Sequence, residues 1–97
     1  MTIVALLTVR RAELATFHAF ERAAQAIMRR HGGAIERVIE LAEPSEHHRE
    51  LHVVGFASTA GWEAYRADPE LALLAADRAA AVVSTELWIG HDVAPPP

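Results

Sequence analysis

The 97-residue sequence contains no cysteine, no lysine and no asparagine. The lack of cysteine excludes disulfide bonds, thiolate metal sites and a cysteine nucleophile. All 9 basic residues are arginines, and they are scattered among 13 acidic residues, which gives a formal net charge of -4. Because proteins that bind nucleic acids typically carry a clustered basic patch, the sequence predicts no nucleic-acid partner.

Long apolar segments are also missing. The first apolar run, residues 3–9, is too short to cross a membrane or to form the core of a signal peptide, and two arginines follow it rather than precede it. We therefore expect a cytoplasmic protein with no membrane partner. The length favours a single domain, which we assign to residues 1–93. We expect residues 94–97, which include three prolines, to form a disordered tail.

Hydrophobic periodicity predicts secondary-structure elements in the order β-α-β-β-α-β. Residues 13–31 carry apolar side chains on one face of a helix, and strand character is found at residues 3–9, 34–41, 51–56 and 82–89. A pair of glycines ends the first helix. Ser58 is a suitable N-cap for a second helix that begins near Thr59, and the pair Asp68-Pro69 stops this helix and can start another, alanine-rich one.

The pattern of the strands predicts their order in the sheet. Residues 3–9 and 51–56 are apolar on both alternating faces, as in central strands, whereas residues 34–41 alternate with charged residues, as in an edge strand. With right-handed crossovers, the sequence predicts an α+β fold of the ferredoxin-like type, with an antiparallel four-stranded sheet and both helices on one face. The apolar residues left on the other face predict a homodimer that packs sheet against sheet and buries roughly 800 Å² per partner.

Two ionisable residues occupy positions where apolar residues are expected. Glu21 falls within the apolar arc of the first helix, and no cation stands four positions later to neutralise it. Burial would raise its pKa, which suits a general acid or base; alternatively, Glu21 lies at the rim of the arc and pairs with Arg66 or Arg78. His52 is the only polar side chain among residues 51–56. It faces either a cavity under the helices or the dimer interface; alternatively, it is a hydrogen-bonded structural histidine of the core or of the interface.

The sequence gives no sign of a metal or cofactor site. It contains six histidines, but His48 and His52 on one strand face would stand about 13 Å apart, too far for two ligands of one ion. Only a site assembled from distant segments, such as His18 or His91 joining His52, would work. Neither a glycine-rich nucleotide motif nor a serine-hydrolase motif occurs. We therefore expect a protein that needs no metal and no cofactor.

Four segments of the sequence support a family comparison. They are F-x-x-F-E-x-x-A-x-x-I-M-x-x-H-G-G from Phe17, H-V-V-G-F-A-S from His52, A-Y-R-A-D-P from Ala64 and T-E-L-W-I-G from Thr85. Together they resemble the dimeric α+β barrel superfamily, and within it the small single-domain proteins of the DUF1330 and EthD-like type. That superfamily includes cofactor-independent monooxygenases, cyclases and isomerases, so the resemblance implies a fold and a ligand cavity rather than one reaction.

The resemblance also implies site residues. Trp62, Tyr65 and Arg66 are similar to the aromatic and cationic residues that such monooxygenases place on the helix after the third strand, although this sequence has no asparagine to accompany them. The two aromatic residues also fit a plain hydrophobic core. The candidate catalytic residues are Glu21, His52 and Arg66, and the candidate substrate-binding residues are Phe17, Trp62, Tyr65 and Trp88.

Two functions remain open from the sequence. In the first, a homodimeric barrel binds a small apolar or aromatic molecule between sheet and helices and acts as a cofactor-independent monooxygenase, cyclase or isomerase. In the second, the barrel is a non-catalytic module that carries a ligand or serves assembly. An enzyme needs open volume beside a titratable group, whereas an assembly module can fill the same space with leucine and alanine side chains.

Overall fold

The computed structural model describes residues 1–97 and has the predicted α+β fold, a four-stranded antiparallel sheet with helices on one face. The strand order is β2-β3-β1-β4, so β1 and β3 are central and β2 is an edge strand, as predicted. The strands are β1 (Thr2–Val9), β2 (Gly33–Glu40), β3 (His48–Phe56) and β4 (Val82–Gly90). The helices are the 3-10 turn η1 (Arg11–Glu13), α1 (Leu14–Arg30), α2 (Thr59–Arg66), α3 (Pro69–Ala72) and α4 (Ala75–Ala81).

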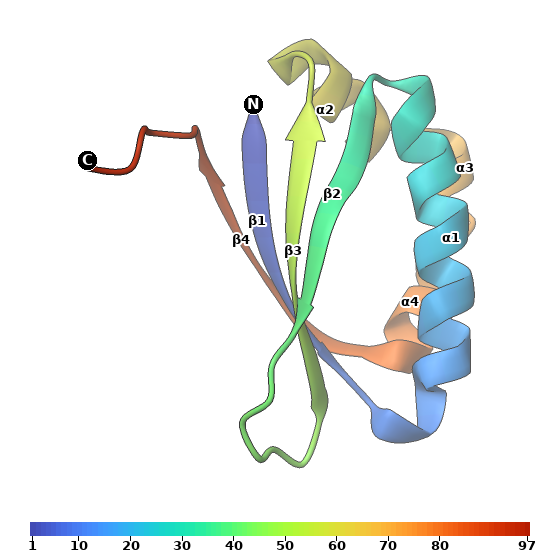
Figure 1. The fold of residues 1–97 in the computed structure, drawn as a ribbon. Helices are drawn as coiled ribbons and strands as arrows, with labels where there is room; N and C mark the ends of the chain where they lie inside the picture. The colour runs from blue at the N-terminus through green and yellow to red at the C-terminus, as the bar shows by residue number, and fades with distance from the viewer.

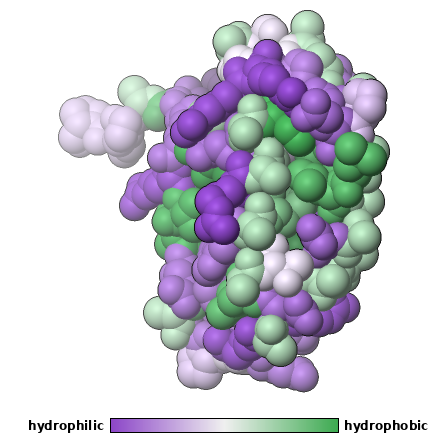
Figure 2. All heavy atoms as spheres, turned by 90° about the vertical axis from the view of Figure 1, so that its right-hand side faces the viewer, coloured by the Kyte–Doolittle hydropathy of each residue, from purple (hydrophilic) through white to green (hydrophobic).

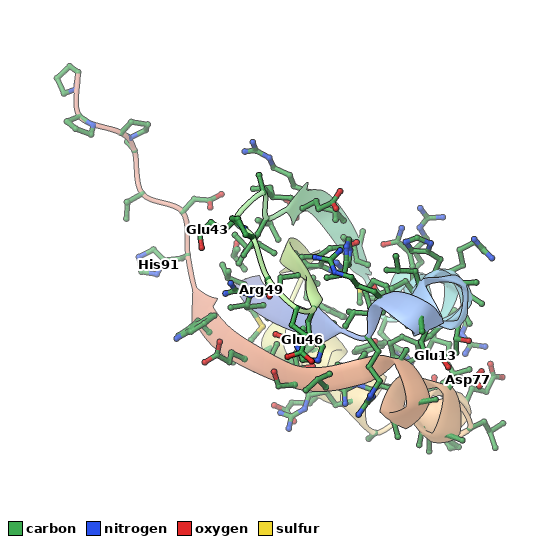
Figure 3. All side chains as sticks on the ribbon, turned by 90° about the horizontal axis from the view of Figure 1, so that it is seen from below. Glu13, Glu43, Glu46, Arg49, Asp77 and His91 are labelled. Atoms are coloured by element: carbon green, nitrogen blue, oxygen red, sulfur yellow. The ribbon has the colours of Figure 1, made fainter.

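The helices form a single layer against the sheet. In Figure 1, α1, α3 and α4 cover one face, α2 lies at the end where β3 finishes, and no helix lies on the other face. Figure 3 shows the same layers from below, with Glu13 and Asp77 on the helix side and His91 in the C-terminal segment, which runs away from the sheet. No helix is long and apolar enough to cross a membrane.

Local sequence signals account for the helix ends. Ser58 caps α2, since its Oγ accepts a hydrogen bond from the Gly61 amide at 3.0 Å. Asp68 caps α3 in the same way, with Oδ1 at 2.9 Å from the Glu70 amide, and proline occupies the first turn. The single helix expected after Pro69 is divided into α3 and α4. The break coincides with hydrogen bonds from the amides of residues 73 and 74 to carbonyls three residues earlier, which tighten the chain into 3-10 geometry.

The turn from α1 into β2 explains the paired glycines. Gly32 has a φ of +77°, in the left-handed region that glycine adopts without strain. At Gly33 an added Cβ would stand 2.3 Å from the ring of Phe56, so this position is closed to any side chain unless the ring moves. The helix therefore ends where predicted, within one residue.

The core changes character along β3. Near its C-terminal end, Val54 and Phe56 are buried in an apolar cluster with residues of β1, α1 and α2. Toward its N-terminal end, the buried positions of the same face are polar: His48, Glu50 and His52 are each less than 10% exposed. This polar half of the strand sets the location of the candidate site.

The face of the sheet without helices is apolar at its centre. Val4 of β1 is paired with Val53 of β3 and with Trp88 of β4, and Leu6 is paired with Leu51. The β1 and β3 members of this group are half-buried, whereas Trp88 is 52% exposed. Residues paired across antiparallel strands share a face, so these five side chains form one surface, which we call the bare sheet face.

Candidate functional site

A cavity of about 370 Å³ lies between the sheet and the helices. Of its 19 lining residues, 14 are hydrophobic. The others are Glu21, His52, Arg66, Arg78 and Thr85. Apolar walls with a few converging polar groups are the usual make-up of a small-molecule site. Seen from outside, the helix layer above this cavity shows a band of hydrophobic residues between hydrophilic margins (Figure 2).

Trp62 and Tyr65 of α2 form an aromatic wall of the cavity, and Phe56 of β3 packs against both rings. The rings of Trp62 and Tyr65 are stacked with centroids 6.0 Å apart, and both rings also contact Phe56. The guanidinium of Arg66 lies 5.3 Å above the Trp62 ring, which holds its charge at the cavity. The indole Nε1 of Trp62 is buried and has no hydrogen-bond partner. A buried donor of this kind calls for an acceptor, which a bound molecule can supply.

Glu21 and His52 meet at the cavity wall. Oε2 of Glu21 stands 3.5 Å from Nδ1 of His52, and their side chains are 18% and 5% exposed. Burial raises the pKa of the Glu21 carboxyl, and the nearby imidazole of His52 partly opposes this rise. Of the partners considered from the sequence, Arg66 instead approaches Glu63 at 3.9 Å and Arg78 donates a hydrogen bond to Thr85, so neither forms an ion pair with Glu21.

Glu50 is a further candidate residue of this site, which the sequence analysis did not single out. Its Oε1 is 2.9 Å from Nε2 of His52, and its Oε2 is 2.6 Å from Nε2 of His48. The hydrogen bond from His52 is the main cause that lowers the pKa of Glu50. An ionised carboxylate only accepts hydrogen bonds, so both rings must donate their Nε2–H to it. In the neutral form of His52 the lone pair is then on Nδ1, the nitrogen that faces Glu21.

The signal for Glu50 was present in the sequence. Residues at positions i and i+2 of a strand share a face, so a buried His52 on β3 implies that Glu50 and His48 point the same way. The strand was predicted to begin after Glu50, which left both residues in or beside the loop. In the structure β3 begins at His48, and all three side chains lie on the helix side of the sheet.

A second, polar hollow of about 400 Å³ adjoins the cavity. It shares Glu21, His52 and Ile35 with the first cavity, and only 3 of its 11 lining residues are hydrophobic. Phe17 belongs to this hollow rather than to the apolar cavity; it is fully buried, and its ring centroid is 6.4 Å from that of His52. Glu21 and His52 thus stand between an apolar space and a polar one.

The structure brings together most of the residues expected at the site. Glu21, His52, Trp62, Tyr65 and Arg66 all line the apolar cavity. Trp88 does not, because its pairing with β1 places it on the bare sheet face. The structure of the single chain therefore places Trp88 away from the cavity wall. Its neighbour Leu87 and the nearby Thr85 line the cavity instead. No group of three or more histidine, aspartate or glutamate side chains is arranged to hold a metal ion.

Comparisons with known proteins support the fold. No family model and no curated protein matches the sequence. Among solved structures, the cofactor-independent oxygenase SnoaB from Streptomyces nogalater superposes with a TM-score of 0.66 at 21% identity, over 98% of this chain and 96% of that one. A protein of unknown function from Rhodopseudomonas palustris gives a TM-score of 0.75 at 17% identity, over 97% and 84%. A proposed antibiotic biosynthesis monooxygenase from Nitrosomonas europaea gives 0.65 at 12%, over 93% and 98%.

These similarities confirm the predicted ferredoxin-like α+β fold, with an antiparallel four-stranded sheet and helices on one face. At identities below 25% they extend to the fold alone. The narrower resemblance to proteins of the DUF1330 and EthD-like type stays a prediction, since no family model matches.

Proposed function

We propose that the protein is an enzyme that binds a small apolar or aromatic molecule in the 370 Å³ cavity and removes a proton from it with His52. The observation that carries this proposal is a buried histidine on the wall of an apolar cavity, with one ring nitrogen bound to Glu50 and the other turned toward Glu21. A histidine oriented by a carboxylate in this way is a common form of general base.

The proton transfer follows from the hydrogen bonds of the ring. Nδ1 of His52 takes the proton from an acidic C–H or O–H group, and the bonding electrons stay on the ligand as an enolate or phenolate. The imidazolium that forms is compensated by Glu50, which accepts its Nε2–H at 2.9 Å. Because burial raises the pKa of Glu21, its carboxyl is suited to hold or return the same proton beside Nδ1.

The cavity also supplies groups for the anion that remains. Arg66 and Arg78 both line it, so a developing negative charge meets two guanidinium groups. The unpaired indole N–H of Trp62 fits a carbonyl or phenolate oxygen of the ligand. These groups favour an aromatic or otherwise apolar body that carries one oxygen-centred polar group.

A deprotonated aromatic ligand has two main fates. It can react with dioxygen, which converts a CH₂ group to a carbonyl with release of one water. Alternatively, it stays at the same oxidation level: reprotonation at another atom is an isomerisation, whereas addition of the carbanion to a carbonyl carbon of the same molecule, with the proton returned to the new alkoxide, is a cyclisation. SnoaB is a cofactor-independent oxygenase, which supports reaction with dioxygen as the fate to test first. Neither fate calls for a cofactor, because the ligand itself supplies the electrons.

The functional unit that we propose is a homodimer formed through the bare sheet face. Val4, Leu6, Leu51 and Val53 are apolar and only half-buried there, and Trp88 is 52% exposed. Exposed apolar surfaces of this continuity commonly mark an interface between protein chains. A sheet-to-sheet contact of standard size would bury about 800 Å² per partner.

Two probes test the proposed function. 4-Nitrophenol is small, aromatic and acidic, and its yellow phenolate reports the proton transfer directly; anthrone carries an acidic CH₂ group that oxygen converts to a carbonyl. At a pH where free 4-nitrophenol is neutral, we expect the protein to bind it as phenolate, and His52→Gln to bind it without colour. With anthrone in air, we expect oxygen uptake that falls on the order of a hundredfold in His52→Gln.

His31→Gln is the matched control, because His31 also pairs with a carboxylate, that of Asp68 at 2.8 Å, but does not line the cavity. It should behave as wild type in both assays. Binding of neutral 4-nitrophenol by wild type, with no colour and no anthrone turnover, would contradict catalysis and indicate a ligand carrier. Deprotonation without oxygen uptake would direct the search to isomerase substrates.

A further inference from the structure

The Glu50 carboxylate accepts hydrogen bonds from two histidines, and the proton transfer proposed above involves only the one from His52. His52 binds Oε1 at 2.9 Å, whereas His48 binds Oε2 at 2.6 Å from the other side. The three side chains alternate along β3 as histidine, glutamate and histidine on one face, and all three are buried. His48 lines neither the apolar cavity nor the polar hollow, so it has no direct access to a ligand in either space.

The far side of His48 faces a carboxylate near solvent. Its Nδ1 is 3.4 Å from Oε1 of Glu40, whose side chain is 69% exposed, whereas that of His48 is 8% exposed. Glu40 and Glu50 are direct partners in the pairing of β2 with β3, which places the second carboxylate beside the first. A continuous row of side chains therefore runs from the cavity to the surface: His52, Glu50, His48 and Glu40.

We propose that His48 is a positioning residue for His52, which acts through Glu50 to fix the orientation of the His52 ring and to set how readily its Nδ1 takes a proton. The assignment builds on the proposed function, because it concerns the basicity of the same histidine. It adds a residue that lies outside the cavity and an exposed carboxylate, Glu40, that tunes it.

The orientation effect follows from the two convergent hydrogen bonds. A carboxylate bonded through one oxygen can rotate about its side-chain torsions, and the ring that it holds can turn with it. When both oxygens accept a hydrogen bond from a buried ring, the carboxylate plane is fixed. Nε2 of His52 then keeps its proton toward Glu50, and Nδ1 keeps its direction toward Glu21.

The charge effect follows from the shared carboxylate. A proton on His48 makes its ring a cation that competes with protonated His52 for the single charge of Glu50. Besides Glu40, the charged or titratable groups around Glu50 and His52 are Glu21, His18 and Arg22 from α1, Glu36 and Arg37 from β2, and Arg66 and Arg78 in the lining of the apolar cavity. From β1 the paired residue is the apolar Leu7, so His48 and His52 are the only groups that hydrogen-bond to the Glu50 carboxylate.

A purely structural role accounts poorly for this row. Replacing a buried ionic group with apolar side chains of similar volume is often neutral or stabilising, so stability alone gives no reason for three buried polar side chains in the sheet. A role in setting the proton affinity of His52 does give such a reason.

The test is a titration of both imidazoles by nitrogen NMR, without any ligand. In His48→Gln, which keeps an N–H donor for Glu50 but carries no charge, we expect His52 to retain its Nε2–H tautomer and its titration midpoint to rise by about one pH unit. His31→Gln is the control and should leave His52 unchanged, because it removes a histidine paired with Asp68 elsewhere. A His52 curve in His48→Gln that coincides with wild type would overturn the proposal.

A second variant covers the case in which His48→Gln does not fold. Glu40→Gln changes an exposed side chain, and Glu63→Gln, 63% exposed on α2, is its control. If His48 mediates the effect, its own midpoint should fall while that of His52 rises. A direct effect of the lost charge would lower both midpoints, and that result would contradict the proposal.

The two proposals fail separately. Because the titration needs no ligand, the expected shifts in a protein that never ionises 4-nitrophenol would support the role of His48 and contradict only the proposed function. If the protein does ionise 4-nitrophenol, His48→Gln should change the pH dependence of that reaction and leave the affinity for the neutral phenol unchanged. Unchanged pH dependence would overturn the role of His48 alone.

Discussion

Replacing Glu50 with glutamine tests the centre of the site. The change keeps the shape of the side chain but turns one of its two acceptor oxygens into an N–H₂ donor. The remaining oxygen can accept from His48 or from His52, whereas the other ring loses its acceptor and keeps a hydrogen bond to the amide only if its proton moves to Nδ1. A hydrogen bond to a charged group contributes about 1.5–3 kcal/mol, so we expect Glu50→Gln to lower the free energy of unfolding at neutral pH by about this amount.

In thermal unfolding, each 1 kcal/mol corresponds to roughly 4–8 °C for a domain of this size, so the melting temperature should fall by roughly 6–24 °C. The loss should depend on pH. The pKa of Glu50 is lowered in the folded protein from its usual value of 4.5, chiefly by the hydrogen bond from His52. A carboxylate with a lowered pKa stabilises the fold above its unfolded pKa, and this contribution disappears as the pH falls through the folded pKa.

The difference between wild type and Glu50→Gln should therefore be complete at neutral pH and should shrink below about pH 4.5. Urea unfolding followed by circular dichroism at several pH values measures it. Asp68→Asn is the control, because Asp68 also accepts from a histidine, His31 at 2.8 Å, but from one ring and not two, and it should show a smaller loss. Equal stability of Glu50→Gln and wild type at neutral pH would refute the reasoning.

Three further predictions concern the rest of the molecule. Glu21→Gln should unfold at the same or a higher temperature than wild type, because burial raises the pKa of this carboxyl and its charged form is destabilising. Ionisation of 4-nitrophenol should nevertheless fall on the order of a hundredfold. A clear loss of melting temperature would contradict the catalytic assignment of Glu21. Burial raises the pKa of Tyr65, the only tyrosine, to about 12, so ultraviolet titration should show its phenolate about two units above the usual value of 10. The stability of the fold should decline as the pH rises above 10, because the tyrosine ionises first in the unfolded chain. A titration midpoint near 10 in the folded protein would contradict this prediction. Wild type should sediment as a dimer at micromolar concentration. Val4→Asp, which places a charge in the bare sheet face, should sediment as a folded monomer. A monomeric wild type would contradict the proposed dimer interface.

The sequence alone determined the elements and their order in the sheet. Helix ends depend on contacts within a few residues, so the caps at Ser58 and Asp68 and the turn at Gly32 could be predicted without the fold. The central positions of β1 and β3 followed from apolar residues on both of their faces. Glu21 and His52 were found for the same reason, since each is a polar residue at a position that the local pattern marks as buried.

The tertiary structure decided which residues meet. The partner of Glu21 is His52 rather than an arginine, because the packing of α1 on β3 brings together residues 31 positions apart, and no local pattern specifies that contact. Trp88 lies on the bare sheet face because the register between β1 and β4 pairs it with Val4. A shift of one residue would have turned it into the cavity, since side chains alternate with a period of two. Alternation groups the residues of one strand, but only the pairing of strands and the placement of the helices assign each group to the cavity or to the opposite face.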